Sequence, residues 1–135
     1  MTETRSTDTG TTEEASHVVL GDTARGTVIA QRLRADGYPT AVVAETDEEG
    51  ADAADVLTDP AALADAGVDE ASTVIVATRS DGRNLLVAQL ARAHFDVPRL
   101  LVLANDPSRA TALAEAGHEP VCVASAVSES VVEEA

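Results

Sequence analysis

The segment that decides the expected fold is HVVLGDTARGTVIAQRLR, residues 17–34. It opens with a short apolar run, typical of a buried strand, and passes through a glycine into a helical pattern. Small and apolar residues recur every three or four positions along that pattern, on the face formed by Gly26, Ile29, Ala30 and Leu33. The segment therefore predicts a strand, a tight turn and an amphipathic helix in direct succession.

The glycines of this turn are spaced as in a phosphate-binding loop. Dinucleotide-binding units carry G-x-G-x-x-G here: the first glycine makes the turn, the second admits the pyrophosphate, and the third packs the helix on the strand. Gly21 and Gly26 occupy the first and third positions, whereas Thr23 stands at the second. Glu45 ends the next apolar run, where such units place the acid that binds a ribose hydroxyl. The layout predicts a nucleotide site whose pyrophosphate contact is altered.

Length and composition favour one α/β domain. The chain has 135 residues and a hydrophobic content of 44%, with one Tyr, one Phe and no Trp, so aliphatic residues must build the core. Short apolar runs alternate with helical patterns, which predicts a Rossmann-like, doubly wound parallel sheet of about six strands with helices on both faces. The strand candidates are residues 17–20, 40–44, 73–77, 99–103 and 120–123, with Val56-Leu57 as a very short sixth.

Capping residues mark the expected helices. Two helices begin with an acid followed by proline and end at a glycine, namely Asp59-Pro60 with Gly67, and Asp106-Pro107 with Gly117. Ser80 or Asp81 is the expected cap of the helix between them.

The expected organisation has three parts. Residues 1–16 are rich in Thr and Glu and predict a disordered arm. Residues 17–124 form the nucleotide-binding domain, and residues 125–135 belong to a closing helix that begins near Ala124. Val127 and Val131 lie on one face of that helix, which predicts contact with a second copy of the chain in a homodimer.

The chain is strongly acidic. Its net charge of −15 comes from 24 acids against nine bases, and all nine are Arg. Such a charge repels phosphate backbones and anionic lipid, so we expect no nucleic-acid partner. An acid excess without Lys is typical of proteins from a halophilic cytoplasm. The alternative is an acidic protein from a cell with ordinary salt concentration. No apolar run approaches the roughly 20 residues of a membrane span, and the N-terminus does not resemble a signal peptide, so we expect a cytoplasmic protein without membrane insertion.

Catalytic and metal chemistry is not indicated. Cys122 stands alone in an apolar run and predicts an inert buried thiol. The three histidines, His17, His94 and His118, lack metal-ligand spacing. Serines at the element edges have capping as their plain explanation, so we expect no catalytic residues and no enzyme.

An ordered set of motifs resembles the TrkA-N domain, also called the RCK N-terminal domain. The resemblance covers about residues 17–125. Its motifs are Gly21 to Gly26, Glu45, Thr58-Asp59-Pro60, Ala66-Gly67-Val68-Asp69-Glu70-Ala71, Val74-Ile75-Val76-Ala77-Thr78, Ser80-Asp81 with Asn84, Phe95-Asp96-Val97-Pro98-Arg99 and Asn105-Asp106-Pro107.

This resemblance implies a cytoplasmic regulatory subunit of a potassium transporter or channel. Members of the family bind NAD(H) or an adenine nucleotide such as ATP or ADP and assemble as dimers and rings. The resemblance places Asp59 beside the adenosine and Thr78 beside the phosphates. With the loop and its neighbours, the expected cofactor-binding residues are Gly21, Asp22, Thr23, Ala24, Arg25, Gly26, Glu45, Asp59, Ala77, Thr78 and Arg79.

Three departures from the family pattern concern the ligand and the assembly. Thr23 brings a side chain and Asp22 a negative charge to the pyrophosphate position, and Leu103 stands where the family usually has a phosphate-facing Arg. Arg25 and Arg79 are candidates to replace that cation, although salt bridges to neighbouring acids explain them equally well. The usual C-terminal RCK domain does not follow the closing helix. A ligand-free assembly module and a small NAD-dependent oxidoreductase are the alternative functions.

Overall fold

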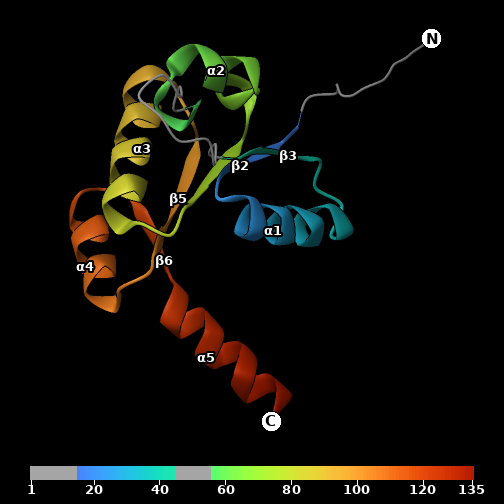
Figure 1. The fold of residues 1–135 in the computed structure, drawn as a ribbon, viewed down its shortest axis with the longest axis vertical. Coiled ribbons are helices and arrows are strands. Elements are labelled where there is room, and N and C mark those ends of the chain that lie inside the picture. Colours follow the sequence, from blue (N-terminus) through green and yellow to red (C-terminus); the bar gives the residue numbers. More distant parts are fainter. Residues whose placement is uncertain (1–14, 45–55) are drawn as a thin grey trace.

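The computed structural model describes residues 15–44 and 56–135, which contain a parallel five-stranded sheet (Figure 1). The strand order is β3-β2-β4-β5-β6. The strands are β2 (His17–Gly21), β3 (Thr40–Ala44), β4 (Thr73–Ala77), β5 (Arg99–Ala104) and β6 (Glu119–Cys122). Each lies within about one residue of its predicted run because apolar runs of this length identify buried parallel strands well.

In the described part of the chain, five α-helices and two short 3-10 helices connect and cover the strands. The α-helices are α1 (Thr23–Ala35), α2 (Pro60–Asp65), α3 (Asp81–His94), α4 (Pro107–Glu115) and α5 (Val123–Glu134). The 3-10 helices are η1 (Val56–Thr58) and η2 (Val68–Glu70). Helix α1 lies on one side of the sheet, α2, α3 and α4 lie on the other, and α5 projects beyond the rest of the domain (Figure 1).

Alternate strand residues divide the core into two clusters. Val18 and Val74 belong to the larger cluster, which α2, α3 and α4 complete. Val19 and Ile75 belong to the smaller one, which packs against Ile29 of α1. This alternation confirms the prediction of a sheet with helices on both faces, but the α1 side is the less covered one.

The prediction of a sixth strand at Val56-Leu57 was wrong. These residues form η1, and the Leu57 side chain is fully buried in the larger core cluster. The reason is topological: β3 and β4 pair with opposite sides of β2, so the chain between them has to cross the sheet. A two-residue apolar pair on that crossing anchors the connection to the core.

The predicted helix boundaries are largely confirmed. Asp59 and Asp106 cap α2 and α4 through their carboxylates, and Gly67 and Gly117 follow those helices with φ of 95° and 91°. Ser80 rather than Asp81 caps α3, because its hydroxyl accepts the Arg83 N–H. The predicted N-terminal arm lies outside the described residues except for its last two.

Candidate functional site

The candidate site lies at the switch point of the sheet, where β2 has β3 on one side and β4 on the other. Gly21 and Ala77 end β2 and β4 and stand opposite one another in register. Helix α1 begins two residues after Gly21, so its N-terminus faces this edge. Ligands of open parallel sheets bind in the crevice beyond such strand ends. We call residues 21–26 the α1 loop.

The two glycines of the α1 loop have different structural causes. A Cβ on Gly21 would lie 2.3 Å from the carbonyl oxygen of Ala77, so glycine is required by the close approach of β2 to β4. A Cβ on Gly26 would lie 3.0 Å from Cγ1 of Val42, which confirms that the third glycine packs α1 against β3. Both matches to the fingerprint are therefore explained by packing within the chain.

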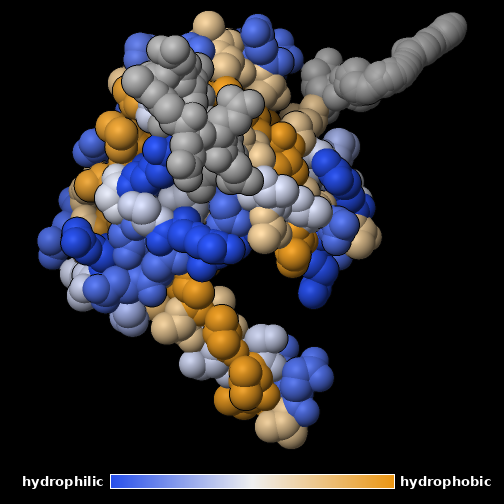
Figure 2. All heavy atoms as spheres, viewed as in Figure 1, coloured by the Kyte–Doolittle hydropathy of each residue, from blue (hydrophilic) through white to orange (hydrophobic). Residues whose placement is uncertain are grey.

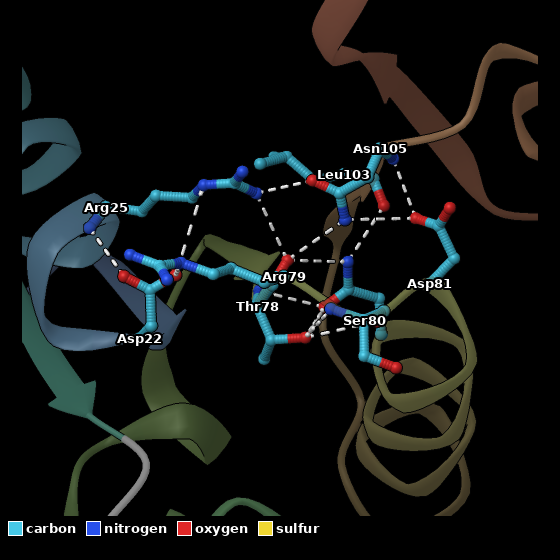
Figure 3. Close-up of polar contacts among 9 residues, drawn as sticks. Asp22, Arg25, Thr78, Arg79, Ser80, Asp81, Leu103 and Asn105 are labelled. Carbon is cyan, nitrogen blue, oxygen red and sulfur yellow. Dashed lines mark hydrogen bonds and ion pairs between the residues drawn. The ribbon is translucent and has the colours of Figure 1, made fainter. Parts of the chain in front are cut away.

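Asp22 occupies the N-terminus of α1. Its Oδ1 accepts the backbone N–H of Arg25 at 2.8 Å, which makes Asp22 the N-cap. Its Oδ2 is buried and has no hydrogen-bond partner in the described part of the chain. Nε of Arg79 lies 3.6 Å and Nε of Arg25 lies 3.9 Å from that oxygen (Figure 3). Two guanidinium groups thus surround one carboxylate at the start of the helix.

Arg25 extends from α1 across the ends of two other strands. Its Nη1 donates to Oδ1 of Asn105 at 2.5 Å and to the carbonyl oxygen of Thr78 at 3.3 Å (Figure 3). Asn105 follows β5, and Thr78 follows β4. The side chain therefore joins the α1 loop to the far side of the switch point, a link that the sequence analysis missed.

The turn after β4 is fixed by a buried network. Oδ1 of Asn84, which is fully buried, accepts from the backbone N–H of Thr78 at 2.8 Å and from its hydroxyl at 2.6 Å. Nδ2 of Asn84 donates to the carbonyl oxygens of Thr78 and Leu103, at 3.2 and 3.0 Å. The Thr78 side chain is thus used internally, so it positions the loop beside the site instead of facing the crevice.

Asp81 joins the same region to the start of α4. Its carboxylate accepts the backbone N–H of Asn105 at 2.7 Å (Figure 3). It also accepts the backbone N–H of Asp106 at 2.9 Å. From the sequence, Asp81 is expected as an alternative cap of α3, without this second role. The signal that could have identified it is the spare acid beside the true cap, Ser80.

The remaining predicted residues are distributed unevenly. Thr23 and Ala24 lie exposed in the first turn of α1, and within the described residues their N–H groups have no acceptor. The Arg79 side chain is 74% exposed, and Asp59 is an exposed cap of α2 whose carboxylate accepts the Ala61 N–H. The predicted ribose ligand, Glu45, lies outside the described residues. Leu103 is buried in the smaller core cluster.

Other titratable groups do not form a centre. The described ranges contain no group of His, Cys, Asp and Glu able to hold a metal ion. Burial lowers the pKa of His118, with a further contribution from Arg92, and burial and Arg99 lower that of His17. Cys122 is half-buried, and hydrogen bonds from Ser125 lower the pKa of its thiol, so it differs from the inert buried thiol expected.

No helix among residues 15–44 and 56–135 has the length and apolar character needed to cross a membrane.

Sheet order and helix placement define the chain as a Rossmann-like α/β domain. The family model of the TrkA-N domain matches residues 17–129, and the chain belongs to this family. Among solved structures, it is similar to the NAD(P)-binding domain of an exopolyphosphatase-related protein from Archaeoglobus fulgidus, with 25% identity and a TM-score of 0.73. That similarity covers 90% of this chain and 97% of the other. No significant match was found among curated proteins.

Proposed function

We propose that the chain is a cytoplasmic regulatory subunit that binds an adenine nucleotide, NAD(H) or ATP/ADP, and controls a potassium transporter or channel. The observation that carries the nucleotide part is the arrangement of the α1 loop at the switch point. Family membership and the NAD(P)-binding domain of the structural neighbour favour the same ligand class. The family resemblance supports a regulatory role.

The residues of the α1 loop fit a phosphate group. The N–H groups of Thr23 and Ala24 stand at the positive end of the α1 dipole, and Arg25 and Arg79 add two cations beside it. These cations supply the charge that Leu103 does not. The negative charge of Asp22 opposes a phosphate at the same place.

Isothermal titration with NAD+, NADH, ATP and ADP in molar potassium chloride tests the nucleotide proposal. Arg25→Gln should weaken binding of the ligands by about tenfold or more, because a hydrogen bond to a charged group contributes about 1.5 to 3 kcal/mol. Arg32→Gln is the matched control, since Arg32 is an exposed residue near the other end of α1. Absence of binding by the wild type, at millimolar ligand, would contradict the proposal.

We propose that the chain works as a homodimer through α5. Val127, Val131 and Val132 are 56%, 60% and 73% exposed, and Figure 2 shows apolar side chains along this helix. An apolar groove between α1 and α5, lined in part by Val28 and Leu103, continues that surface. Exposed apolar area of this kind favours a partner surface.

Light scattering tests the dimer. Val127→Asp with Val131→Asp should give a monomer with an unchanged sheet, since both residues lie outside the two core clusters. Ser130→Asp adds a charge to the same helix on a side away from Val131 and Val132 and should leave the dimer intact. A wild type that is monomeric at tens of micromolar in molar salt would refute this part.

The transporter part needs a cellular measurement. Potassium uptake should fall when the chain is removed and return with the wild type but not with Arg25→Gln. An unchanged uptake rate would remove the transporter from the proposal while leaving nucleotide binding untouched.

A ligand-free assembly module is the second candidate function. The observation that favours it is Asp22, whose carboxylate already caps the helix that a pyrophosphate would meet. Titration with nucleotides separates the two candidates directly. An oxidoreductase is tested by NADH absorbance with alcohol and keto substrates, and we expect no turnover.

A further inference from the structure

We propose that Asp22 is an internal anion that competes with the phosphate groups of the ligand for the α1 N-terminus and for Arg25 and Arg79. This inference rests on the proposed nucleotide site and specifies how that site discriminates between ligands. The discriminating property is the charge that a ligand places over the first turn of α1.

The expected phosphate position already holds a negative charge. One Asp22 oxygen accepts a hydrogen bond from the backbone N–H of Arg25. That N–H is one of the donors at the helix start that have no partner within the helix. The carboxylate also lies at the positive end of the helix dipole. A phosphate that approaches the N–H groups of Thr23 and Ala24 therefore meets a like charge within a few ångströms, where repulsion is strong.

The other carboxylate oxygen of Asp22, Oδ2, makes no hydrogen bond within the described residues. Oδ2 is buried, and the Asp22 side chain is only 14% exposed, so two nearby guanidinium groups are its compensation. A buried carboxylate oxygen without a hydrogen bond is costly. If a phosphate takes over the guanidinium groups, Asp22 can turn to water and recover its hydration. The exchange replaces one anion by another at an unchanged pair of cations.

The two arginines differ in how easily they can follow such an exchange. The Arg25 side chain is 33% exposed and is held by Asn105 and Thr78. The Arg79 side chain is 74% exposed, and its only described partner is Asp22 at 3.6 Å. Arg79 is therefore the cation that Asp22 holds away from a ligand, and replacing Asp22 by an uncharged residue should make Arg79 available.

The experiment compares a ligand with phosphates and one without. Affinities for ADP, adenosine and inorganic pyrophosphate are measured at one potassium chloride concentration for the wild type, Asp22→Asn and Asp22→Ser. Asn and Ser both retain an N-cap oxygen, so the helix start is preserved. Asp36→Asn is the matched control, because it removes the same charge from the opposite end of α1.

Both Asp22 variants should bind ADP about tenfold more tightly than the wild type does. The affinity for pyrophosphate should also rise, whereas the affinity for adenosine should change by less than about twofold. Asp36→Asn should leave the ratio of the ADP and adenosine affinities unchanged. If adenosine and ADP bind but their ratio is the same in all variants, the competition is refuted and the nucleotide function stands. If neither ligand binds any variant, the nucleotide function fails, and the absent gain refutes the competition as well.

Discussion

Two helices of this chain begin in the same way and end up in different surroundings. Helix α1 follows β2 and is capped by Asp22, and helix α4 follows β5 and is capped by Asp106. The exposed Asp106 carboxylate accepts from the N–H and the hydroxyl of Ser108, both at 3.0 Å. Asp22 is largely enclosed and is faced by two arginines, one of them from the turn after β4.

The difference shows what separates a cap from a candidate ligand site. The Asp106 carboxylate obtains its hydrogen bonds from its own helix, so its capping role is local. Asp22 has a partner that is distant in sequence, because α1 starts at the switch point where strand ends from different parts of the chain meet. The same residue type at the N-cap thus has a local role at one helix and a wider one at the other.

The largest expected effect is at Asn84, since it joins the turn after β4 to the end of β5. Asn84→Ala leaves the Thr78 N–H and the Leu103 carbonyl without their partner, and buried groups of this kind cost about 1 to 3 kcal/mol each. We expect a loss of about 3 kcal/mol in the free energy of unfolding, measured by chemical denaturation. Gln89→Ala, an exposed change on the same helix, should cost little. Equal stability of the two variants would show that the network is replaceable by water.

Gly21 is the next test, because it belongs to the α1 start alone. In Gly21→Ala the new Cβ meets the Ala77 carbonyl at 2.3 Å, so β2 and β4 must separate. Overpacking of this kind costs about 1 to 3 kcal/mol, and we expect about 2 kcal/mol. Gly82→Ala is the control, since its Cβ would have only an ordinary contact at 3.9 Å. If the two variants have the same melting temperature, the close approach of β2 and β4 does not require a glycine at position 21.

Much of the fold follows from local sequence. Apolar runs gave all five strands, and the pairs of acid and proline gave the starts of α2 and α4, because strands and caps depend on neighbouring residues. The sixth strand failed because Leu57 is buried by the crossing of the sheet and not by pairing. The order of the strands decides that crossing, and no local pattern of residues 56–57 contains it.

The position of the α1 loop was predicted from sequence but its contacts were not. Gly21, Gly26 and the following helix were sufficient to place the α1 loop at strand ends. The bond from Arg25 to Asn105 joins residues that are 80 positions apart, and it exists because β4 lies between β2 and β5. The central role of Asn84 was equally hidden, because a polar residue in the first turn of a helix is usually exposed. Contacts between side chains at the ends of different strands can thus be predicted only when the order of the strands is known.

The dependence of stability on salt concentration tests the effect of the acidic net charge of the whole chain. Around Asp22 the cations outnumber the acid, whereas the whole chain has 24 acids and nine Arg. Self-repulsion is screened in molar salt, so stability should fall as potassium chloride is withdrawn. We expect the melting temperature to fall by about 4 °C, the shift that 1 kcal/mol produces in a domain of this size, between 3 M and 0.1 M salt. A flat melting temperature would argue against a halophilic protein.

The smallest expected effect is the pH dependence of the α4 cap. Hydrogen bonds from the Ser108 N–H and hydroxyl lower the pKa of Asp106 below its usual value near 3.9. A carboxylate with a lowered folded-state pKa stabilises the fold above its unfolded pKa, and that contribution is lost as the pH falls through the folded value. Melting curves from about pH 5 to pH 2 should therefore show a steeper loss of stability in the wild type than in Asp106→Asn, which keeps a capping oxygen without the charge. Ser108→Ala should lie between them, since it removes the hydroxyl and retains the backbone N–H. Because Asp106 is exposed, the differences should be small, and identical acid profiles for all three proteins would mean that the cap acts through its geometry alone.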